Sequence, residues 1–564
     1  MIVGIDLGTT NSLVAVWHEG APQLVANALG ELLTPSVVGL DDQGQILVGQ
    51  VAYERLQTHP QLTTALFKRH MGSGHEIRLG GRVFRPEELS ALVLRSLKAD
   101  VERVYGLPVT QAVISVPAYF SDAQRKATRI AGELAGLQVD TLINEPTAAA
   151  LAYGVHQREE TTFLVFDLGG GTFDVSILEL FDGVMEVRAS AGDNFLGGED
   201  FDDALVHWFC ARLRSRDKAP DLDAAPVQQR LRREARRVRH ALGQQAQVEF
   251  SLALGDEVWS ETLSQPQLQE VVTPLLDRLR APLERALRDA RINAPDLDEV
   301  LLVGGTTRMP LVRKLVTGLF GRFPSLHLNP DEVIAQGAAI QAALKARDAA
   351  LEEVVLTDVC PYSLGVETTK QLGAQFDGGH FLPIIERNSV VPVSRMHGLQ
   401  TLHDQQKQVL LKIYQGESRL VKNNIFLGEL DIPVPPRKAG EVSLEVRFTY
   451  DINGLLEALV HIPMTGQHHR LVIENTPGVL SPAEIDQRLK ALDALKIHPR
   501  DQQVNSLLMA RLERLYQECL GEQRQYVGQL AEQFQQVLDG QDERLIRDAR
   551  RVVSERMEAL ERDF

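Results

Sequence analysis

The sequence predicts a multidomain protein: an α/β part built from two similar lobes, then a β-sandwich, then a short α-helical region. Two strand–turn–strand units with the same Asp-Leu-Gly turn lie near residues 6 and 167, a domain's length apart. Strands alternate with helical patterns up to about residue 353, and short strands separated by Gly and Pro follow to about residue 476. From Ser481 onward, apolar residues recur at helical spacing.

The second of the repeated units, residues 162–179, is the most informative stretch. An apolar run ends at Asp167, three glycines follow at 169–171, and Thr172 and Asp174 lead into another apolar run. Glycine lets backbone N–H groups crowd an anion because it has no Cβ, and a buried strand-end aspartate is tolerable when it faces a hydrated metal ion. The pattern predicts a phosphate cradle with a carboxylate for Mg²⁺. The alternative is an ordinary pair of hairpins with glycine turns, which the flanking Thr and Asp residues disfavour.

The first unit, residues 2–17, has the same layout around Asp6 and continues through Gly8, Thr9, Thr10 and Asn11. Two such units predict a duplicated lobe, with phosphates held between two facing hairpins.

Charged residues between the two units are candidates for chemistry. Lys68 follows an apolar run and would ordinarily be a solvated lysine, but a polyphosphate site needs a cation nearby. Glu145 precedes Pro146 at the start of a predicted helix, where a carboxylate complements the helix dipole. In this segment Glu145 also suits a base or a group that orients water. Another helix is predicted to open at Ser121-Asp122, with Asp122 as its N-cap.

Three further stretches suit a ligand. Residues 230–239 carry six arginines, which we interpret first as a solvated helix face and second as a face that meets a nucleotide. Gly304 and Gly305 lie between an apolar strand and a helix, which allows close approach of a flat or anionic ligand. The small residues at 337–339 predict close helix packing near the same ligand.

Composition limits the function classes. A net charge of −17 disfavours a general nucleic-acid or anionic-membrane binder. The three cysteines are far apart and are interpreted as buried small hydrophobes in a reducing compartment. No apolar run reaches transmembrane length, and the N-terminus has no basic signal-peptide region. We therefore expect a cytoplasmic protein without nucleic-acid or membrane partners.

Taken together, the motifs resemble one family, the DnaK-type heat-shock chaperones. The resemblance covers nearly the whole chain and rests on GIDLGTTNS (4–12), AVISVPAYFSDAQRKAT (112–128), LINEPTAAALAYG (142–154), FDLGGGTFDVS (166–176), LGGEDFD (196–202), LLVGGTTRMP (301–310), NPDEVIAQGAA (329–339), LTDVCPYSLGVE (356–367), YQGE (414–417) and YDINGLLE (450–457). The short C-terminal region and the sequence around the linker are similar to those of the HscC branch.

The resemblance implies an actin-like ATPase domain with ribonuclease H-like duplicated lobes at 1–353, an interdomain linker at 354–358, a peptide-binding β-sandwich at 359–478 and a helical lid at 479–564. It implies an ATP-dependent molecular chaperone, in which ATP binding and hydrolysis control the binding and release of unfolded or extended hydrophobic peptide segments. The implied ligands are ATP, ADP and Mg²⁺, with K⁺ as a candidate further ion. A J-domain co-chaperone is the implied partner. The nucleotide-exchange factor is left open, because the segment 200–300 is shorter than is usual in the family.

The resemblance also assigns roles to individual residues. Lys68 would contact the phosphates, and Asp6 and Asp167 would hold Mg²⁺ through water. Glu145 and Asp174 would organise the attacking water, with Thr172 beside the γ-phosphate. The nucleotide-binding set is Gly8, Thr9, Thr10, Asn11, Gly169, Gly170, Gly171, Gly198, Arg239, Gly304, Gly305, Thr306, Arg308 and Asp331. Interdomain coupling is implied for Pro117, Arg125, Val354, Val355, Leu356 and Asp358. The peptide pocket is implied at Val366, Leu399, Leu402, Val409 and Leu411.

The chain departs from the family pattern at several positions. On the helix that would cradle the adenosine, Arg236, Arg239 and Gly243 replace the usual Glu, Lys and Ser. Arg239 can still stack on or donate to a nucleotide, but Arg236 cannot accept a hydrogen bond, so we expect weaker or altered adenosine affinity. Thr357 interrupts the apolar run of the linker, and Leu399 stands where the pocket often has an aromatic residue.

Two other functions are weighed against the chaperone. A sugar kinase of the same superfold would need a substrate cleft between the lobes, and it would have no use for a linker and a β-sandwich. A regulatory ATPase switch dedicated to one protein partner would have no affinity for generic hydrophobic peptides. The motif set favours the chaperone over both.

Overall fold

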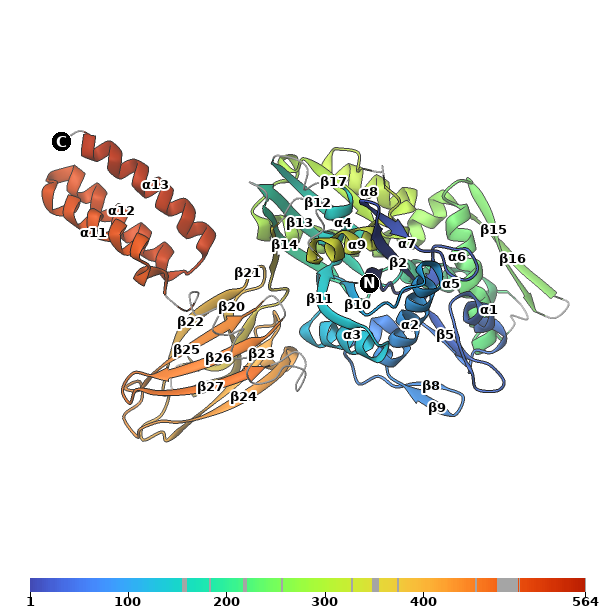
Figure 1. The fold of residues 1–564 in the computed structure, drawn as a ribbon, viewed down its shortest axis with the longest axis horizontal. Helices are drawn as coiled ribbons and strands as arrows, with labels where there is room; N and C mark the ends of the chain where they lie inside the picture. Colours follow the sequence, from blue (N-terminus) through green and yellow to red (C-terminus); the bar gives the residue numbers. More distant parts are fainter. Residues whose placement is uncertain are drawn as a thin grey trace. The chain divides into compact units, whose positions relative to one another are not determined.

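The computed structural model describes residues 1–154, 160–181, 184–216, 221–254, 257–325, 328–346, 355–372, 375–451, 454–473, 496 and 498–562. They form two compact units, Met1–Pro361 and Tyr362–Phe564. Figure 1 colours the first unit from blue to yellow and the second from yellow to red. The finer boundaries at 353/354 and 358/359, and that between sandwich and lid at 478/479, stay a prediction.

The first lobe is built on a mixed sheet in the order β11–β10–β1–β2–β3, with β4 paired to β2. Its elements are β1 (Ile2–Asp6), β2 (Asn11–His18), β3 (Ala21–Leu24), β4 (Thr34–Pro35), β5 (Val37–Leu40), β6 (Ile46–Val48), α1 (Gln50–Thr58), β7 (Thr63–Ala65), the 3₁₀ helix η1 (Phe67–His70), β8 (Ile77–Leu79), β9 (Arg82–Phe84), α2 (Pro86–Tyr105), β10 (Gln111–Val116), α3 (Asp122–Leu134), β11 (Gln138–Asn144) and α4 (Glu145–Ala152). The predicted start of α3 is right, but its N-cap is Ser121 and not Asp122. Gln124 Oε1 accepts a hydrogen bond from the Ser121 backbone N–H at 2.9 Å, which is one half of a capping box.

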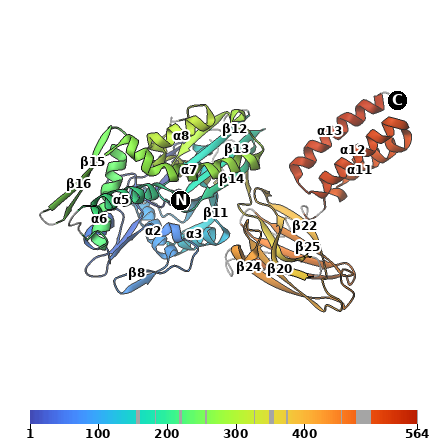
Figure 2. The ribbon, with the colours of Figure 1, turned by 180° about the vertical axis from the view of Figure 1, so that it is seen from behind.

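The second lobe repeats this plan with a sheet that includes the order β17–β12–β13–β14–β18. Its elements are β12 (Thr161–Leu168), β13 (Phe173–Phe181), β14 (Val184–Asp193), α5 (Gly198–Arg214), α6 (Ala225–Ala241), β15 (Gln247–Leu254), β16 (Glu257–Ser264), α7 (Gln265–Ala290), η3 (Ala294–Asp296), β17 (Glu299–Val303), η4 (Gly305–Arg308), α8 (Pro310–Phe320) and β18 (Val355–Val359). Helix α9 (Val333–Lys345) returns to the first lobe, where it packs against β1, β2, β3 and β10. Helix α7 packs against β13 and β14, which Figure 2 shows from behind.

The two sheets have the same strand relations. In the first lobe, β1 runs parallel to β10 and antiparallel to β2; in the second, β12 runs parallel to β17 and antiparallel to β13. Asp6 closes β1, and Asp167 lies near the end of β12, opposite Asp174. This correspondence confirms the duplication that the two Asp-Leu-Gly turns predict.

Small residues let α9 approach its neighbours closely, as predicted for 337–339. A Cβ on Gly337 would lie 1.8 Å from the carbonyl oxygen of Ala148 in α4, and a Cβ on Gly4 would lie 2.1 Å from the backbone nitrogen of Ala339. Helices α4 and α9 and strand β1 therefore pack with backbone against backbone, directly behind the strand that ends at Asp6.

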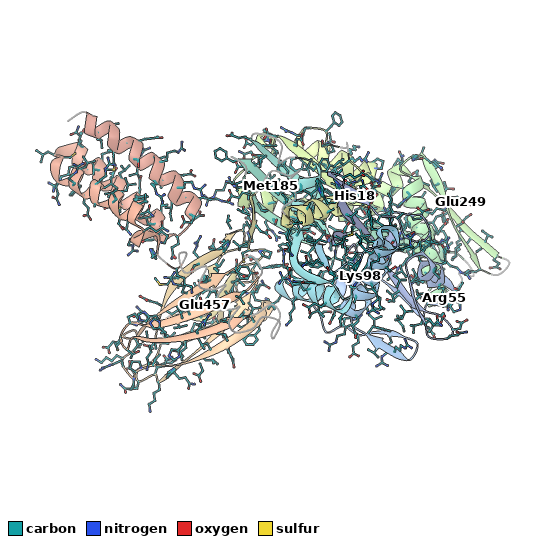
Figure 3. All side chains as sticks on the ribbon, viewed as in Figure 1. His18, Arg55, Lys98, Met185, Glu249 and Glu457 are labelled. Carbon is teal, nitrogen blue, oxygen red and sulfur yellow. The ribbon has the colours of Figure 1, made fainter. Side chains whose placement is uncertain are left out.

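The predicted linker forms strand β18 from residue 355 onward. In β18, Val355 pairs with Val184 and Leu356 pairs with Met185 of β14, in parallel register. Met185 is labelled in Figure 3. Val354 lies outside the described residues. The hydroxyl of Thr357 donates to the carbonyl oxygen of Met185 at 3.5 Å, so this polar residue has a hydrogen-bond partner on the neighbouring strand.

The second unit opens with a β-sandwich, as predicted. One sheet has the order β20–β19–β23–β24 and the other β22–β25–β26–β27. The strands are β19 (Leu364–Leu372), β20 (Gln375–Ile385), β21 (Val390–Val391), β22 (Val393–Gln400), β23 (Gln408–Gln415), β24 (Ile425–Pro433), β25 (Ser443–Tyr450), β26 (Leu456–Ile462) and β27 (Gln467–Ile473), with the 3₁₀ turn η5 (Val421–Asn423). Alternate residues of β25 are buried because they face the space between the sheets.

Three helices follow η7 (Pro499–Asp501): α11 (Gln503–Glu518), α12 (Gly521–Asp539) and α13 (Glu543–Arg562). The predicted apolar stripe of α11 is buried at Leu508, Leu512 and Leu515. In α13 the predicted stripe is wrong at Leu545, which is 37% exposed, because Ile546 faces the core instead. The predicted capping box at 481–484 lies outside the described residues. No helix in the described ranges is both long and apolar enough to cross a membrane, and all three cysteines are buried, as predicted.

Candidate functional site

The two glycine turns meet each other across the lobes. A Cβ on Gly170 would lie 1.8 Å from the Thr10 hydroxyl oxygen, and a Cβ on Gly171 would lie 2.5 Å from the Thr9 methyl group. Within the second turn, the backbone N–H of Gly169 donates to the carbonyl of Thr172 at 3.1 Å. The two turns therefore face each other, as the sequence predicts, and glycine is required there because no side chain fits.

A buried lysine lies beside the turns. The Lys68 Nζ atom on η1 donates to Glu145 Oε1 at 3.1 Å, and the two side chains are 4% and 7% exposed. Glu145 begins α4, where the helix dipole favours its negative charge. The surface-lysine interpretation is thus wrong for Lys68, since a buried ammonium needs a partner and has one.

Three aspartates join Glu145 in the same buried region. Asp6 accepts a hydrogen bond from the Ser115 hydroxyl at 2.9 Å, and Asp174 accepts one from the Tyr119 backbone N–H at 3.0 Å. Burial, then repulsion from Glu145, raises the pKa of Asp6 and of Asp174 to about 7. The same two causes raise the pKa of Asp167 well above its ordinary value.

The raised pKa values mean that burial and mutual repulsion disfavour the charged carboxylates more than Lys68 favours them. Asp167 Oδ2 is buried without a hydrogen-bond partner, which is costly unless a cation or its water approaches. No group of three or more metal-ligating side chains within the described residues is close enough to hold an ion directly. Buried carboxylates with an unsatisfied oxygen fit a hydrated Mg²⁺, because Mg²⁺ keeps several of its waters in such sites.

A cavity of about 430 Å³ extends from this cluster between the lobes. Most of the predicted nucleotide residues line it: Asp6, Gly8, Thr9, Thr10, Asn11, Lys68, Glu145, Asp167, Gly169, Gly170, Thr172, Gly198, Arg239, Gly304, Gly305, Thr306, Arg308 and Asp331. Gly171 and Asp174 are not among the lining residues. The volume suits a ligand of nucleotide size.

One end of the cavity is built by η4 and the start of α9. Gly304 has a φ of +82°, and its Cβ would lie 2.4 Å from the Leu168 carbonyl oxygen, so glycine is needed. The Arg308 guanidinium donates to Asp331 Oδ2 from Nε at 3.0 Å and from Nη2 at 2.8 Å. Thr306 donates to the Gly169 carbonyl at 2.8 Å and ties this end to the phosphate turn.

The arginines of α6 are held by carboxylates of α5. Arg239 is 7% exposed and binds Asp202 through both Nε, at 2.6 Å, and Nη2, at 3.2 Å. Arg236 pairs with Glu199 and with Asp202. Asp202 thus occupies N–H donors at the edge of the Arg239 guanidinium group, and the flat face of that group is left for stacking on a ligand. Gly243 does not line the cavity.

Sequence reasoning missed several lining residues. Glu199, His240 and Ile334 line the cavity beside the predicted set. Glu199 lies inside the quoted LGGEDFD motif, so that motif was the available signal. Ile334 likewise lies inside the quoted NPDEVIAQGAA motif, whereas His240 carries no local signal, because it reaches the cavity only through the packing of α6.

A polar network joins this site to the strand β18. Arg125 donates from Nη2 to Asn144 Oδ1 at 2.7 Å, and Asn144 donates from Nδ2 to Asp358 Oδ2 at 2.6 Å. Asn144 directly precedes Glu145, the partner of Lys68. Asn144 was not predicted. Pro117 lies in the same loop region, where its carbonyl accepts from the Phe120 backbone N–H at 3.1 Å.

Two predicted pocket residues lie in the sandwich core. Val366 of β19 pairs with Ile413 of β23. Leu411 lies on the same face as Ile413, since side chains alternate along a strand. Val366 and Leu411 are 0% and 2% exposed, so both side chains are buried in the sandwich.

The other three predicted pocket residues are partly exposed. Leu399 of β22 pairs with buried Leu444 and so shares the inward face of the second sheet. Leu402 follows β22, and Val409 lies on β23. All three are half-buried, as expected for side chains that a ligand could cover.

A cavity of nucleotide size thus lies between duplicated lobes, in a chain that also carries a β-sandwich and a helical end. The family model described as Hsp70 protein matches residues 2–77 and 73–563. The chaperone protein dnaK3 of Thermosynechococcus vestitus (strain NIES-2133 / IAM M-273 / BP-1) is 40% identical, over 97% of this chain and 85% of the relative. The chain belongs to the Hsp70 family. It is accordingly an ATPase and an ATP-dependent chaperone of the kind that uses Mg²⁺, binds peptide substrates and works with J-domain co-chaperones.

Proposed function

We propose that the cavity between the lobes is the ATP site and that Lys68 contacts the phosphates from the first lobe. The observation that carries this proposal is the buried Lys68–Glu145 pair beside two glycine turns that face each other. Glu145 and Asp174 orient the attacking water, and Thr172 lies beside the γ-phosphate. Phosphoryl transfer needs positioning and charge more than a covalent nucleophile, and these residues supply both.

Asp6 and Asp167 are proposed to hold Mg²⁺ through water. Bound there, the ion neutralises phosphate charge and polarises phosphoryl oxygens. The unsatisfied Asp167 Oδ2 atom supports this assignment. We further propose K⁺ as a second ion near the same carboxylates, which ATPase rates in K⁺ and Na⁺ buffers would test.

The end of the cavity at η4 and the start of α9 is proposed to bind adenosine between Arg239 on one side and Gly304 and Arg308 on the other. Because Glu199 and Asp202 both pair with the Arg236 guanidinium, few of its N–H groups are left to hydrogen-bond a nucleotide hydroxyl. We therefore propose weak or altered adenosine affinity. Calorimetry with ATP tests this, and sub-micromolar binding would contradict it.

Coupling between nucleotide and peptide is proposed to run through Arg125, Asn144 and Asp358 to β18. ATP would weaken peptide binding by favouring one of two states of this strand, and peptide would favour the ADP-like state in return. The peptide pocket is proposed at Leu399, Leu402 and Val409, over the floor of Val366 and Leu411.

A Gly170→Val variant tests the ATP site directly. The added side chain would occupy the contact with Thr10, so ATP binding measured by calorimetry should be lost. Gly318→Val on α8 is the matched control, because a Cβ there meets nothing within 4 Å, and it should bind ATP as the wild type does. Wild-type ATP affinity in Gly170→Val would contradict the proposed site.

Within the family, we propose that the chain belongs to the HscC branch and acts in the cytoplasm. The three buried thiols support a reducing compartment. The specific J-domain partner and exchange factor would be identified by their stimulation of ATP turnover and of ADP release.

A further inference from the structure

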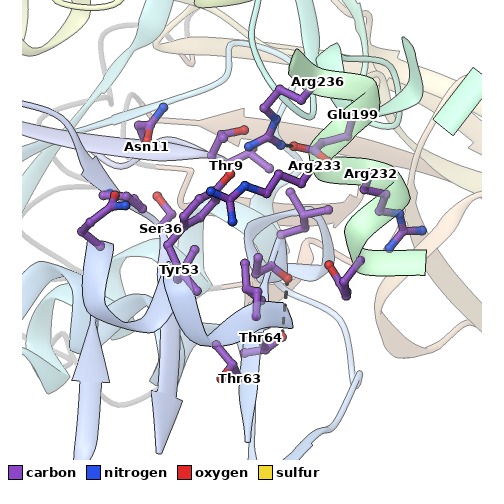
Figure 4. Close-up of a pocket in the computed structure, with 18 residues that line it drawn as sticks. Thr9, Asn11, Ser36, Tyr53, Thr63, Thr64, Glu199, Arg232, Arg233 and Arg236 are labelled. Carbon is purple, nitrogen blue, oxygen red and sulfur yellow. Dashed lines mark hydrogen bonds and ion pairs between the residues drawn. The ribbon is translucent and has the colours of Figure 1, made fainter. Parts of the chain in front are cut away.

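A second cavity, of about 350 Å³, adjoins the nucleotide cavity and lies between α1 of the first lobe and α6 of the second. Figure 4 shows it in close-up. The two cavities share the wall made by Thr9, Thr10, Asn11, Glu199 and Arg236. The second cavity is large enough for a small metabolite, and none of the roles proposed above uses it.

The lining combines three chemistries. Helix α6 contributes Arg232, Arg233 and Arg236, while Glu199 is the one lining carboxylate among the described residues. The first lobe offers the hydroxyl groups of Thr9, Thr10, Ser36, Thr63 and Thr64, together with the Tyr53 ring and apolar side chains. In Figure 4, Arg233 reaches from α6 toward the side of Tyr53 and Ser36.

The outer two arginines are held only loosely by protein carboxylates. Arg233 lies 3.8 Å from Glu54, and both side chains are more than half exposed, so this pair is worth little. Arg232 Nε donates a hydrogen bond to Asp203 at 2.9 Å, and this bond uses one of the five N–H donors of the guanidinium group. An incoming phosphoryl group could therefore take bidentate hydrogen bonds from Arg233 without breaking a strong contact.

A second, independent observation, at Thr63 on the first-lobe side of the cavity, also points to a ligand. The Thr63 side chain is 5% exposed and lines the cavity, yet its Oγ1 atom has no hydrogen-bond partner. Leaving a buried hydroxyl unsatisfied is costly, and a polar ligand in this cavity would satisfy it.

We propose that this cavity is a regulatory site for a phosphoryl group, carried either by a small sugar phosphate or by free phosphate, bound next to the nucleotide. The proposal rests on the proposed ATP site only in taking the neighbouring cavity to hold ADP. A ligand that contacts both α1 and α6 bridges the lobes and slows their separation. Its binding therefore slows ADP release.

The test uses the full chain saturated with Mg²⁺ and ADP. Ribose 5-phosphate, inorganic phosphate and ribose are titrated separately by calorimetry, and release of a fluorescent ADP analogue is timed with and without each compound. Ribose 5-phosphate is expected to bind and to slow ADP release, and ribose to do neither. If inorganic phosphate binds as tightly as ribose 5-phosphate, the site is one for the free anion. If inorganic phosphate binds more weakly, the site is one for a sugar phosphate.

Two variants locate the binding. Arg233→Ala should weaken phosphate-dependent binding about tenfold or more, because it removes a charge-assisted bidentate contact. Thr63→Val, which keeps the shape of the side chain, should weaken it about two- to tenfold. The matched control is Arg230→Ala on the same helix, since Arg230 donates to the Ala253 carbonyl and does not line the cavity.

Absence of binding to the ADP-loaded wild type would overturn the inference, as would equal loss in Arg230→Ala and Arg233→Ala. Affinity for the ADP analogue, measured for every variant, serves as the check on folding. Failure of ADP itself to bind would instead refute the proposed nucleotide site, so the two failures are distinguishable.

Discussion

Replacing Lys68 by alanine leaves Glu145 buried among three other carboxyl groups without its cation. At 3.1 Å and an effective dielectric constant of about 20, Coulomb's law gives an attraction of about 5 kcal/mol for the pair. Breaking one partner of a buried pair typically costs about 3–5 kcal/mol. We therefore expect a loss of about 3 kcal/mol, at the lower end of this range, in the unfolding free energy of the nucleotide-free first unit.

Urea unfolding followed by tryptophan fluorescence measures this loss. All three tryptophans lie in the first unit, at Trp17, Trp208 and Trp259. The matched control is Lys345→Ala, which removes a 2.8 Å pair with Asp140 whose side chains are 27% and 46% exposed. That pair should contribute less than about 1 kcal/mol to the unfolding free energy, because solvent screens the two charges.

The same substitution tests the chemistry. If Lys68 meets developing phosphate charge, single-turnover ATP hydrolysis should fall about 10²- to 10³-fold in Lys68→Ala and stay unchanged in Lys345→Ala. Equal destabilisation by the two substitutions would refute the burial argument, and wild-type hydrolysis in Lys68→Ala would refute the role of the lysine.

Three further predictions follow from individual contacts. Asp167→Asn should raise the Mg²⁺ concentration needed for half-maximal ATPase rate about 10- to 100-fold, as for other groups that orient metal-bound water; an unchanged Mg²⁺ titration would remove Asp167 from the ion site. Gly337→Ala should lower the unfolding free energy by about 1–3 kcal/mol, because the new Cβ meets the Ala148 carbonyl, although alanine is the better helix former. A urea midpoint at or above that of the wild type would show that α4 and α9 can separate. Burial raises the pKa of Asp358, with Arg125 opposing, so docking of β18 is most favourable below the ordinary carboxyl pKa and weakens as the pH rises through the raised value. Hydrogen exchange at residues 355–359, corrected for its intrinsic pH dependence, should therefore become faster as the pH rises in the wild type. In Asp358→Asn the corrected exchange rate should not depend on pH.

Local patterns in the sequence were sufficient to predict the duplicated lobes. The turns at Asp6 and Asp167 carry their own signal, because a strand, a glycine turn and a hydroxyl residue are adjacent in the chain. The close packing of α9 was likewise predictable from Gly337, since only a small residue permits backbone contact there.

Contacts between distant segments could not be predicted in this way. The Asn144–Asp358 bond joins residues 214 positions apart and depends on β18 docking beside β14. The carboxylate that holds Arg239 could not be named, because Asp202 lies on a different helix. The second cavity had no signature either, since the spacing of α1 and α6 arises from the fold of both lobes.

The most direct test of the account is stopped-flow release of a fluorescent hydrophobic peptide from the full chain, first with ADP and then with ATP and Mg²⁺. If the nucleotide cavity and the sandwich are coupled through Asn144, Asp358 and β18, ATP should accelerate release strongly, and Asn144→Ala should reduce the acceleration while leaving ATP binding intact. Equal release rates with ADP and ATP in the wild type would contradict this coupling between the nucleotide cavity and peptide release.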